Sequence, residues 1–168
     1  DQIVSVIKKR FKIKIIIRPH PANRKFFYLT NNKNLNITKL IYKYKNDKKV
    51  FFDFSEDYSN TYGRSYLMIT DLSGTSFTYS FLTKRPVIFF SPRENLFKKH
   101  YKSLNHYKDR KKIGKVINKI NKVNISINEL LSNHSKYRKS ISSLKKKIDY
   151  LGKSKMKTLQ EIKKILNY

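Results

Sequence analysis

Apolar and polar positions in the first half of the chain follow a pattern typical of buried parallel strands. Residues 12–17 first alternate and then become continuously apolar, as expected of a strand covered on both faces. Apolar runs at 50–54, 66–70 and 87–90 predict three more strands. A helix is expected at 75–82, between the last two of them. Strands separated by short helical segments indicate βαβ units, so the sequence predicts an α/β fold with a parallel sheet.

The segments between these strands are less regular. An amphipathic run at 3–7 precedes the first strand, and a short helix is expected at 26–29. Residues 31–36 have the Asn-rich and Lys-rich composition of a loop, and residues 55–65 predict a loop or a short helix.

After about residue 95 the apolar positions recur at helical spacing. Ser126 and Glu129 form a capping-box pattern, which predicts that a helix begins near residue 126. The next apolar stripe consists of Ile141, Leu144, Ile148 and Leu151. A last helix, capped by Ser154, carries the stripe Leu159, Ile162, Ile165 and Leu166. We expect these helices to pack on the sheet as a helical C-terminal tail.

The segment 71–76 offers the clearest candidate chemistry. Its sequence is Asp71-Leu72-Ser73-Gly74-Thr75-Ser76, and it connects a predicted strand to a predicted helix. A helix start presents unpaired backbone N–H groups and a positive dipole end, while glycine allows a ligand to approach the backbone. The turn therefore predicts a phosphate site. Asp71 either orients the turn or contacts a ligand hydroxyl, and the structural role is the stronger expectation.

Three further residues follow predicted strands and point to the same edge of the sheet. His20 lies between two prolines, beside Arg18, where it can donate to a phosphate or carry a proton. We expect this pair to share a sheet edge with the 71–76 turn, because ligands of α/β proteins bind at the carboxyl ends of strands. Glu94 follows the fourth strand and can accept from ribose hydroxyls; the alternative is a surface salt bridge with a nearby lysine.

Composition narrows the function classes. A net charge of +28 attracts anionic substrates and anionic membrane surfaces. Nucleic acid is not favoured, because no nucleic-acid-binding motif accompanies the charge and the excess of Lys, Asn and Ile over a single alanine is typical of an AT-rich genome. The lack of cysteine excludes thiolate metal sites and a cysteine nucleophile. No metal site is expected, and no apolar run approaches the ~20 residues of a spanning helix.

Three segments together resemble the C-terminal half of the CDP-glycerol glycerophosphotransferase family, which makes teichoic-acid and capsule-type polymers. They are Ile15 to Pro21, Met68 to Phe77, and Lys84 to Phe90. The similarity is good over residues 12–95 and loose over 96–168. This family has the GT-B architecture of two Rossmann-like domains, of which the C-terminal one binds the nucleotide-linked donor.

The resemblance implies that residues 1–168 form a single Rossmann-like, donor-binding domain. A preceding N-terminal domain would bind the acceptor and carry the catalytic base. His20 would lie near the donor pyrophosphate, with Arg18 stabilising the leaving nucleotide, and Ser73 to Ser76 would hold phosphate oxygens. The family commonly has Asp-Tyr-Ser-Ser where this chain has Asp71-Leu72-Ser73-Gly74, and an acidic residue where it has Thr78.

The resemblance also implies the partners. No cofactor is expected beyond the donor substrate, which is CDP-glycerol or a nucleotide sugar, and the acceptor is a polymer or a lipid-linked chain. The expected location is cytoplasmic or peripheral on the inner face of a bacterial membrane. Two other functions stay open: a non-catalytic basic module that binds nucleic acid or anionic membrane, and a GT-B-like nucleotide-sugar epimerase that needs no acceptor.

Overall fold

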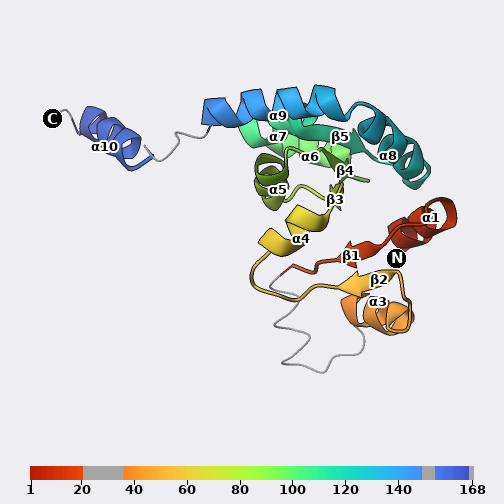
Figure 1. The fold of residues 1–168 in the computed structure, drawn as a ribbon. Coiled ribbons are helices and arrows are strands. Elements are labelled where there is room, and N and C mark those ends of the chain that lie inside the picture. Colours follow the sequence, from red (N-terminus) through yellow and green to blue (C-terminus); the bar gives the residue numbers. More distant parts are fainter. Residues whose placement is uncertain (21–35, 149–153, 167–168) are drawn as a thin grey trace. The chain divides into compact units, whose positions relative to one another are not determined.

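The computed structural model describes residues 1–20, 36–148 and 154–166 (Figure 1). The chain divides into two compact units. One comprises Asp1–Ser65 with Lys119–Ile125, and the other comprises Tyr66–Asn118 with Ser126–Tyr168. Each unit has a small parallel sheet with helices against it, which confirms the predicted α/β, Rossmann-like fold class.

The first unit is built around a two-stranded parallel sheet. Its described elements are α1 (Gln2–Arg10), β1 (Ile15–Ile17), α3 (Asn36–Tyr44), β2 (Val50–Phe52), α4 (Ser59–Arg64) and the 3-10 helix η1 (Ile120–Lys122). β1 pairs in parallel with β2, with Ile15 opposite Val50 and Ile17 opposite Phe52. Val4 of α1, Tyr44 of α3 and Val50 of β2 are buried together, so both helices cover the sheet through apolar side chains.

The second unit holds a three-stranded parallel sheet in the order β3-β4-β5. Its strands are β3 (Met68–Thr70), β4 (Val87–Phe90) and β5 (Gly114–Ile117). Its helices are α5 (Thr75–Thr83), α6 (Glu94–Tyr101), α7 (Asn105–Ile113), α9 (His134–Ile148) and α10 (Ser154–Ile165), together with most of α8 (Val123–Ser132). Val87, Ile88 and Phe89 of the central strand are fully buried, as expected of a parallel strand covered on both faces.

Gly114 is required by the close pairing of β4 and β5. It pairs with Val87, and its backbone is extended, with φ 178°. A Cβ at this position would overlap the backbone carbonyl of Val87. Glycine inside a strand often marks such a close backbone approach, so this residue determines how near the third strand can come.

The sequence analysis located most elements of the first half. β1, β2, β3, α5 and β4 all fall inside or within one residue of their predicted ranges, and the open choice at 55–65 resolves into a loop and α4. The sequence analysis made no prediction for residues 37–49, where the structure has most of α3, and α3 begins at Asn36, the last residue of the predicted 31–36 loop. The helix expected at 26–29 lies outside the described residues.

Two predictions for the second half were wrong. The region after residue 95 is not purely helical, because β5 completes the sheet. The capping box at Ser126 does not begin a helix: α8 begins at Val123, and Ser126 is a buried residue inside it. Ser126 is therefore a small residue that packs inside α8, and the capping-box pattern that it forms with Glu129 in the sequence does not mark a helix start.

Candidate functional site

The 71–76 turn lies where the sequence analysis expected it, between the carboxyl end of β3 and the start of α5. The hydroxyls of Ser73 and Thr75 lie 2.9 Å apart. The amides of Ser76 and Phe77 donate to the carbonyls of Ser73 and Gly74, at 3.2 and 3.1 Å. Within the described part of the chain, the amides of Gly74 and Thr75 donate to no group. Two N–H groups thus remain at the positive end of α5, together with the one hydroxyl proton that the Ser73–Thr75 pair does not use, and an anion is stabilised there.

Gly74 leaves this site open. Its φ of −61° is one that any residue adopts, and no atom lies within 4 Å of where a Cβ would be. Glycine is therefore not needed here to form the turn. Its absent side chain leaves the neighbouring amides accessible from solvent.

Asp71 and Ser76 differ from the other residues of the turn. Asp71 is exposed and caps no amide of α5; the Thr70 hydroxyl contacts its carboxylate at a long 3.5 Å. The expected structural role of Asp71 as a cap was wrong, and its carboxylate is available to a ligand. Ser76 is fully buried, and its hydroxyl donates to the Ser73 carbonyl at 2.7 Å. That bond fixes the shape of the turn.

Glu94 begins α6 and is held by α7. Its carboxylate accepts from the Tyr107 hydroxyl at 2.5 Å and from the Arg110 guanidinium at 2.8 Å. Arg110 is buried, with its guanidinium 4.1 Å from the centre of the Tyr107 ring. Burial alone would raise the pKa of Glu94, but the hydrogen bonds from Arg110 and Tyr107 outweigh it and lower that pKa. The salt bridge predicted as the alternative exists, with a buried arginine in place of a surface lysine.

Arg18, in the first unit, follows β1 and holds the loop after β2. One terminal nitrogen donates to Asp53 and to the Ser55 hydroxyl, the latter at 3.1 Å. The other donates to the carbonyls of Ser55 and Glu56, at 2.6 and 3.2 Å. The Asp53 carboxylate also accepts from Thr61 of α4. We call Arg18, Asp53, Ser55 and Thr61 the Arg18 clamp, because together they tie β1, β2 and α4.

Asp53 is the most strongly perturbed group of the clamp. Burial alone would raise its pKa, but hydrogen bonds from Ser55, Thr61 and Arg18 outweigh it and hold the pKa of Asp53 well below its usual range. Asp53 is therefore ionised at neutral pH. A charge that is paired on one side and hydrogen-bonded on the other stiffens the loop that it joins.

His20 is exposed three residues beyond β1. It follows a strand of the two-stranded sheet, whereas the 71–76 turn follows a strand of the three-stranded sheet. The sequence analysis expected one edge for both, and the structure gives each its own sheet. The approach of His20 to the turn stays a prediction.

Comparison with protein-family models gives a match over residues 6–162 to the family described as CDP-Glycerol:Poly(glycerophosphate) glycerophosphotransferase. The chain belongs to this family. The match covers most of both units, so the family assignment rests on most of the sequence and not on the turn alone. No curated protein and no solved structure matched the chain. The resemblance inferred from three short segments is confirmed, and the chain is a member of a transferase family.

Two features of this family member were missed in its sequence. His106 of α7 was not among the candidate residues, but its ring lies 4.7 Å from that of Phe77 in the first turn of α5. Burial and the charge of Arg110 lower its pKa, so it is neutral at pH 7. The pairing of α7 with α5 could not be read from the sequence, because it depends on how β5 brings α7 back to the sheet.

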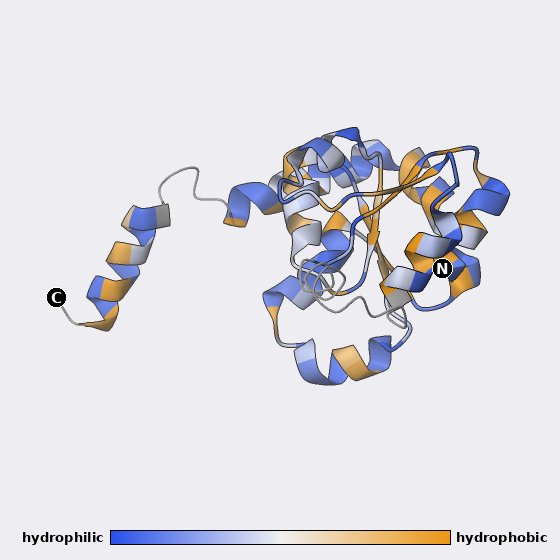
Figure 2. Cartoon of the chain, turned by 90° about the horizontal axis from the view of Figure 1, so that it is seen from below, coloured by the Kyte–Doolittle hydropathy of each residue, from blue (hydrophilic) through white to orange (hydrophobic). Residues whose placement is uncertain are grey.

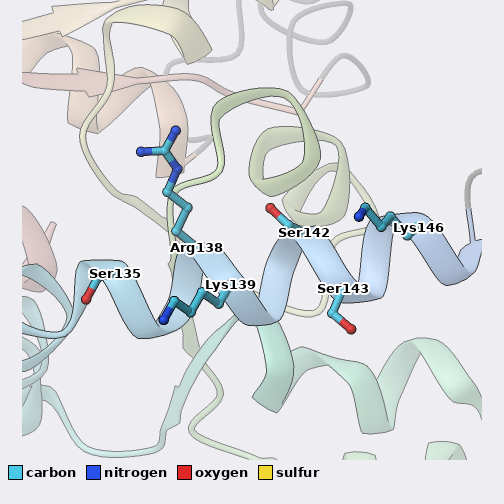
Figure 3. A pocket seen from close by; sticks show the side chains of 6 residues that line it. All are labelled: Ser135, Arg138, Lys139, Ser142, Ser143 and Lys146. Atoms are coloured by element: carbon cyan, nitrogen blue, oxygen red, sulfur yellow. The ribbon is translucent and has the colours of Figure 1, made fainter.

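The second missed feature is an open hollow along α9, shown in Figure 3. Its volume is about 590 Å³, and hydroxyl and cationic side chains line it. These are Ser135, Arg138, Lys139, Ser142, Ser143 and Lys146. They recur every three or four residues, so they form one face of the helix. No acidic residue is among them, which makes this face attractive to anions.

The described residues place two limits on other chemistry. Within the ranges 1–20, 36–148 and 154–166, no group of three His, Cys, Asp or Glu side chains is arranged to hold a metal ion. In those same ranges, no helix is both long enough and apolar enough to cross a membrane.

Proposed function

We propose that this chain binds the nucleotide-linked donor of a glycerophosphotransferase, and that the start of α5 holds a donor phosphate. The observation that carries the proposal is the pair of unused amides at Gly74 and Thr75, beside the hydroxyls of Ser73 and Thr75. A diphosphate can accept from both amides and from the hydroxyl that does not donate to its neighbour, at the helix end where its charge is stabilised. Membership of a family described by CDP-glycerol agrees with a donor of this kind.

The other predicted site residues take different parts in the proposal. Asp71 accepts from a hydroxyl of the donor, because its carboxylate is exposed beside the turn. Ser76 shapes the turn, and Glu94 holds α6 to α7 through Arg110. His20 approaches the donor pyrophosphate as a proton donor or proton carrier. Arg18 acts through the loop that it holds, because Asp53, Ser55 and Glu56 engage its terminal nitrogens.

For the acceptor polymer, whose reacting end the family resemblance gives to a preceding domain, we propose a further contact in the hollow along α9. A poly(glycerophosphate) chain carries one negative charge in each repeat, and Arg138, Lys139 and Lys146 face it with adjacent serine hydroxyls. Arg138→Gln combined with Lys139→Gln is expected to weaken binding of poly(glycerophosphate) by roughly thirtyfold, since each of the two charged contacts contributes roughly 1 kcal/mol. Native affinity in this double variant would contradict the assignment.

Calorimetric titration tests the donor proposal. We expect CDP-glycerol to bind saturably, and Ser73→Ala to weaken that binding by about tenfold, because a hydrogen bond to a charged group is worth roughly 1.5 kcal/mol. Ser103→Ala is the matched control, because Ser103 is an exposed serine of the same unit outside the 71–76 turn. Titrations with CDP and with a nucleotide sugar identify which part of the donor is recognised.

Two results would replace the proposal. If no nucleotide binds but DNA or lipid binds in a salt-sensitive manner, the chain is a basic binding module. If a free nucleotide sugar is converted without acceptor, the epimerase alternative holds. Equal binding by the native chain and Ser73→Ala would remove the turn from the site.

A further inference from the structure

His106 of α7 lies against the first turn of α5, the helix that follows the 71–76 turn. The centre of its ring is 4.7 Å from the centre of the Phe77 ring, and the two ring planes are tilted by 40°. The amide of Phe77 donates to the carbonyl of Gly74 at 3.1 Å, so the residue that His106 contacts is itself hydrogen-bonded to the turn. All three residues belong to the second unit. His106 is thus one ring contact and one hydrogen bond away from the proposed donor site.

α7 has little apolar surface with which to hold α5. In Figure 2 the helices carry hydrophilic and hydrophobic colours side by side, as expected where only one face packs. The one aliphatic residue of α7 is Ile113, which is buried at its C-terminal end. Arg110, the other buried residue of α7, is paired with Glu94 of α6. At the N-terminal end of α7, the ring of His106 makes the contact with α5.

The environment of His106 suits a neutral imidazole. Its Nε2 atom is buried, and within the described part of the chain this atom has no hydrogen-bond partner. Neutral imidazole leaves one nitrogen unprotonated, whereas imidazolium carries a proton on both nitrogens and needs an acceptor for each. Buried polar groups of folded proteins are normally hydrogen-bonded. A second proton on the ring is therefore unfavourable as long as His106 stays in this place.

The charged groups of α7 and α6 add to this preference, with one exception. Burial and the positive charge of Arg110 lower the pKa of His106, and the negative charge of Asp109 opposes them. Asp109 is itself paired with Lys112, at 2.8 Å, and Glu94 of α6 is paired with Arg110. The carboxylates of both helices are thus already engaged by other cations.

The other elements that pack on α7 bring no negative charge to His106. α5 has no charged residue, and burial raises the pKa of its Tyr79 to about 12, so this hydroxyl stays neutral. The charged residues of α9 and β5 are lysines and an arginine, Lys115 of β5 among them. Of the remaining titratable groups of α9, His134 becomes positive on protonation, and burial raises the pKa of Tyr137. Protonation of His106 would add a cation to surroundings that are already positive.

We propose that His106 is a positioning residue for the 71–76 turn, in a chain whose turn binds the donor as proposed above. As neutral imidazole it stays against Phe77 and holds the first turn of α5 in the arrangement that presents the amides of Gly74 and Thr75. On protonation it leaves this contact for solvent, because the imidazolium has no acceptor at Nε2 and is repelled by Arg110. The first turn of α5 then loosens, and the 71–76 turn holds a donor phosphate less tightly.

The direction of the pH effect follows from the packed state. Because the packed ring disfavours a second proton, protons favour the released ring, and donor affinity falls as the pH falls. The released imidazole has an ordinary pKa of ~6.5, so the change begins near that pH. His106 contacts neither the phosphate nor the reacting atoms in this account. A residue that only fills space would give the same affinity at every pH.

Hydrogen exchange of the Ser76 and Phe77 amides tests the proposal without donor. These amides donate to the carbonyls of Ser73 and Gly74, so their protection reports the turn directly. After correction for the intrinsic exchange rate at each pH, we expect their protection in the native chain to fall severalfold from pH ~7.5 to ~5.5. His106→Phe keeps a ring against Phe77 but takes up no proton. Its protection should be the same at both pH values.

Two further variants complete this comparison. His100→Phe is the matched control, because it removes an exposed histidine of α6 in the same unit, and it should keep the full pH dependence of the native chain. His106→Gln covers the case in which His106→Phe does not fold. It is neutral at every pH and lacks the ring, so its protection should be lower than that of the native chain at pH ~7.5 and independent of pH.

Titration of CDP-glycerol over the same range measures the effect on binding. The affinity of the native chain should fall severalfold from pH ~7.5 to ~5.5, and by no more than about tenfold, because an imidazole of pKa ~6.5 is then about ten parts protonated to one part neutral. His106→Phe should lack this component. His20 is present in both chains, so the difference between them at each pH reports His106 alone.

The failure of this proposal differs from the failure of the proposed function. No binding of CDP-glycerol at any pH would overturn the proposed function and, with it, this role of His106. Normal binding whose pH dependence is the same in the native chain and in His106→Phe would overturn the role of His106 alone. So would native exchange protection that is equal at both pH values, or a pH dependence that His100→Phe removes.

Discussion

The loop after β2 and the turn after β3 both leave the carboxyl end of a parallel strand, yet they use their polar groups in opposite ways. In the first unit, Arg18 donates to Asp53, Ser55 and Glu56, and Asp53 also accepts from Thr61. In the second unit, the amides of Gly74 and Thr75 have no partner in the described structure. The loop after β2 is held by hydrogen bonds within the chain, whereas the turn after β3 keeps backbone amides that a ligand can bind.

This difference distinguishes a polar cluster that supports the fold, the Arg18 clamp, from a turn that can bind a ligand. An arginine and an aspartate at a strand end resemble ligand-binding groups in a sequence, but here their charges pair with each other. The serine and glycine of the turn carry no charge, and their value lies in backbone groups that the fold leaves unpaired. The residue types show which edge of the sheet carries polar groups. The hydrogen bonds that these groups already make show which of them are free to hold a ligand.

The largest predicted effect on the free energy of unfolding comes from a substitution in the sheet that supports the 71–76 turn. Gly114→Ala is expected to lower the free energy of unfolding by about 3 kcal/mol or more, because the added methyl overlaps the Val87 carbonyl and β5 must move. Urea denaturation followed by circular dichroism measures this loss. The control is Gly63→Ala in α4, where the added Cβ meets no atom within 4 Å. It should be neutral or gain up to ~1 kcal/mol in helix propensity. Equal effects at 63 and 114 would refute the close approach of β4 and β5.

The next largest effect tests the Arg18 clamp, which holds the loop after β2. Asp53→Asn is expected to lower the free energy of unfolding by about 2 to 3 kcal/mol at pH 7, because Arg18 loses its charged partner. The folded-state pKa of Asp53 lies below the unfolded value of ~3.9, so the stabilisation is fully present above that pH. It is lost as pH falls through the folded pKa.

The pH dependence gives this prediction its control. Native chain and Asp53→Asn should differ in stability at pH 7 and converge as the pH falls from ~4, where the unfolded chain takes up the proton, toward the lower folded-state pKa of Asp53. Urea midpoints measured across this range provide the comparison. A constant difference between the two chains at all pH values would show that the charge of Asp53 contributes nothing to the clamp.

The smallest effect concerns the far end of the helix that bears the open turn. Lys84 ends α5 with φ 59°, in the left-handed region that favours glycine. Lys84→Gly is expected to raise the free energy of unfolding by about 0.5 to 1 kcal/mol through relief of strain. Donor affinity should not change, because the substitution lies a full helix away from the turn. A loss of stability in thermal melts would contradict the strain.

Much of the fold could be predicted because β1, β3 and β4 are continuously apolar and end at polar or proline residues. β5 could not, because Gly114-Lys115-Val116-Ile117 has only two apolar residues and a glycine that is essential for reasons visible only beside Val87. The helix at 123–132 was misplaced because Ser126 resembles a cap, while its burial follows from tertiary packing.

In the candidate site, too, some features could be predicted from the sequence and others could not. The position of the 71–76 turn followed from the change of periodicity between β3 and α5. The engagement of Arg18 by Asp53 and that of Glu94 by Arg110 join residues 35 and 16 positions apart. No local pattern encodes such pairs, so polar residues that looked alike in the sequence were separated only by their partners in the fold.

The central claim, that the turn binds the donor and the Arg18 clamp supports its own loop, is tested most directly by titrating CDP-glycerol into Gly74→Ala and Asp53→Asn. Alanine fits at residue 74 without strain, since no atom lies within 4 Å of the added Cβ, and its methyl would occupy space beside the amides that the proposal gives to the phosphate. The account predicts that Gly74→Ala melts like the native chain and binds about tenfold more weakly, because the added methyl keeps the phosphate from one of the amides and a hydrogen bond to a charged group is worth roughly 1.5 kcal/mol. It predicts that Asp53→Asn loses stability but, where it is folded, keeps its affinity. Unchanged binding by Gly74→Ala, or weakened binding by folded Asp53→Asn alone, would contradict it.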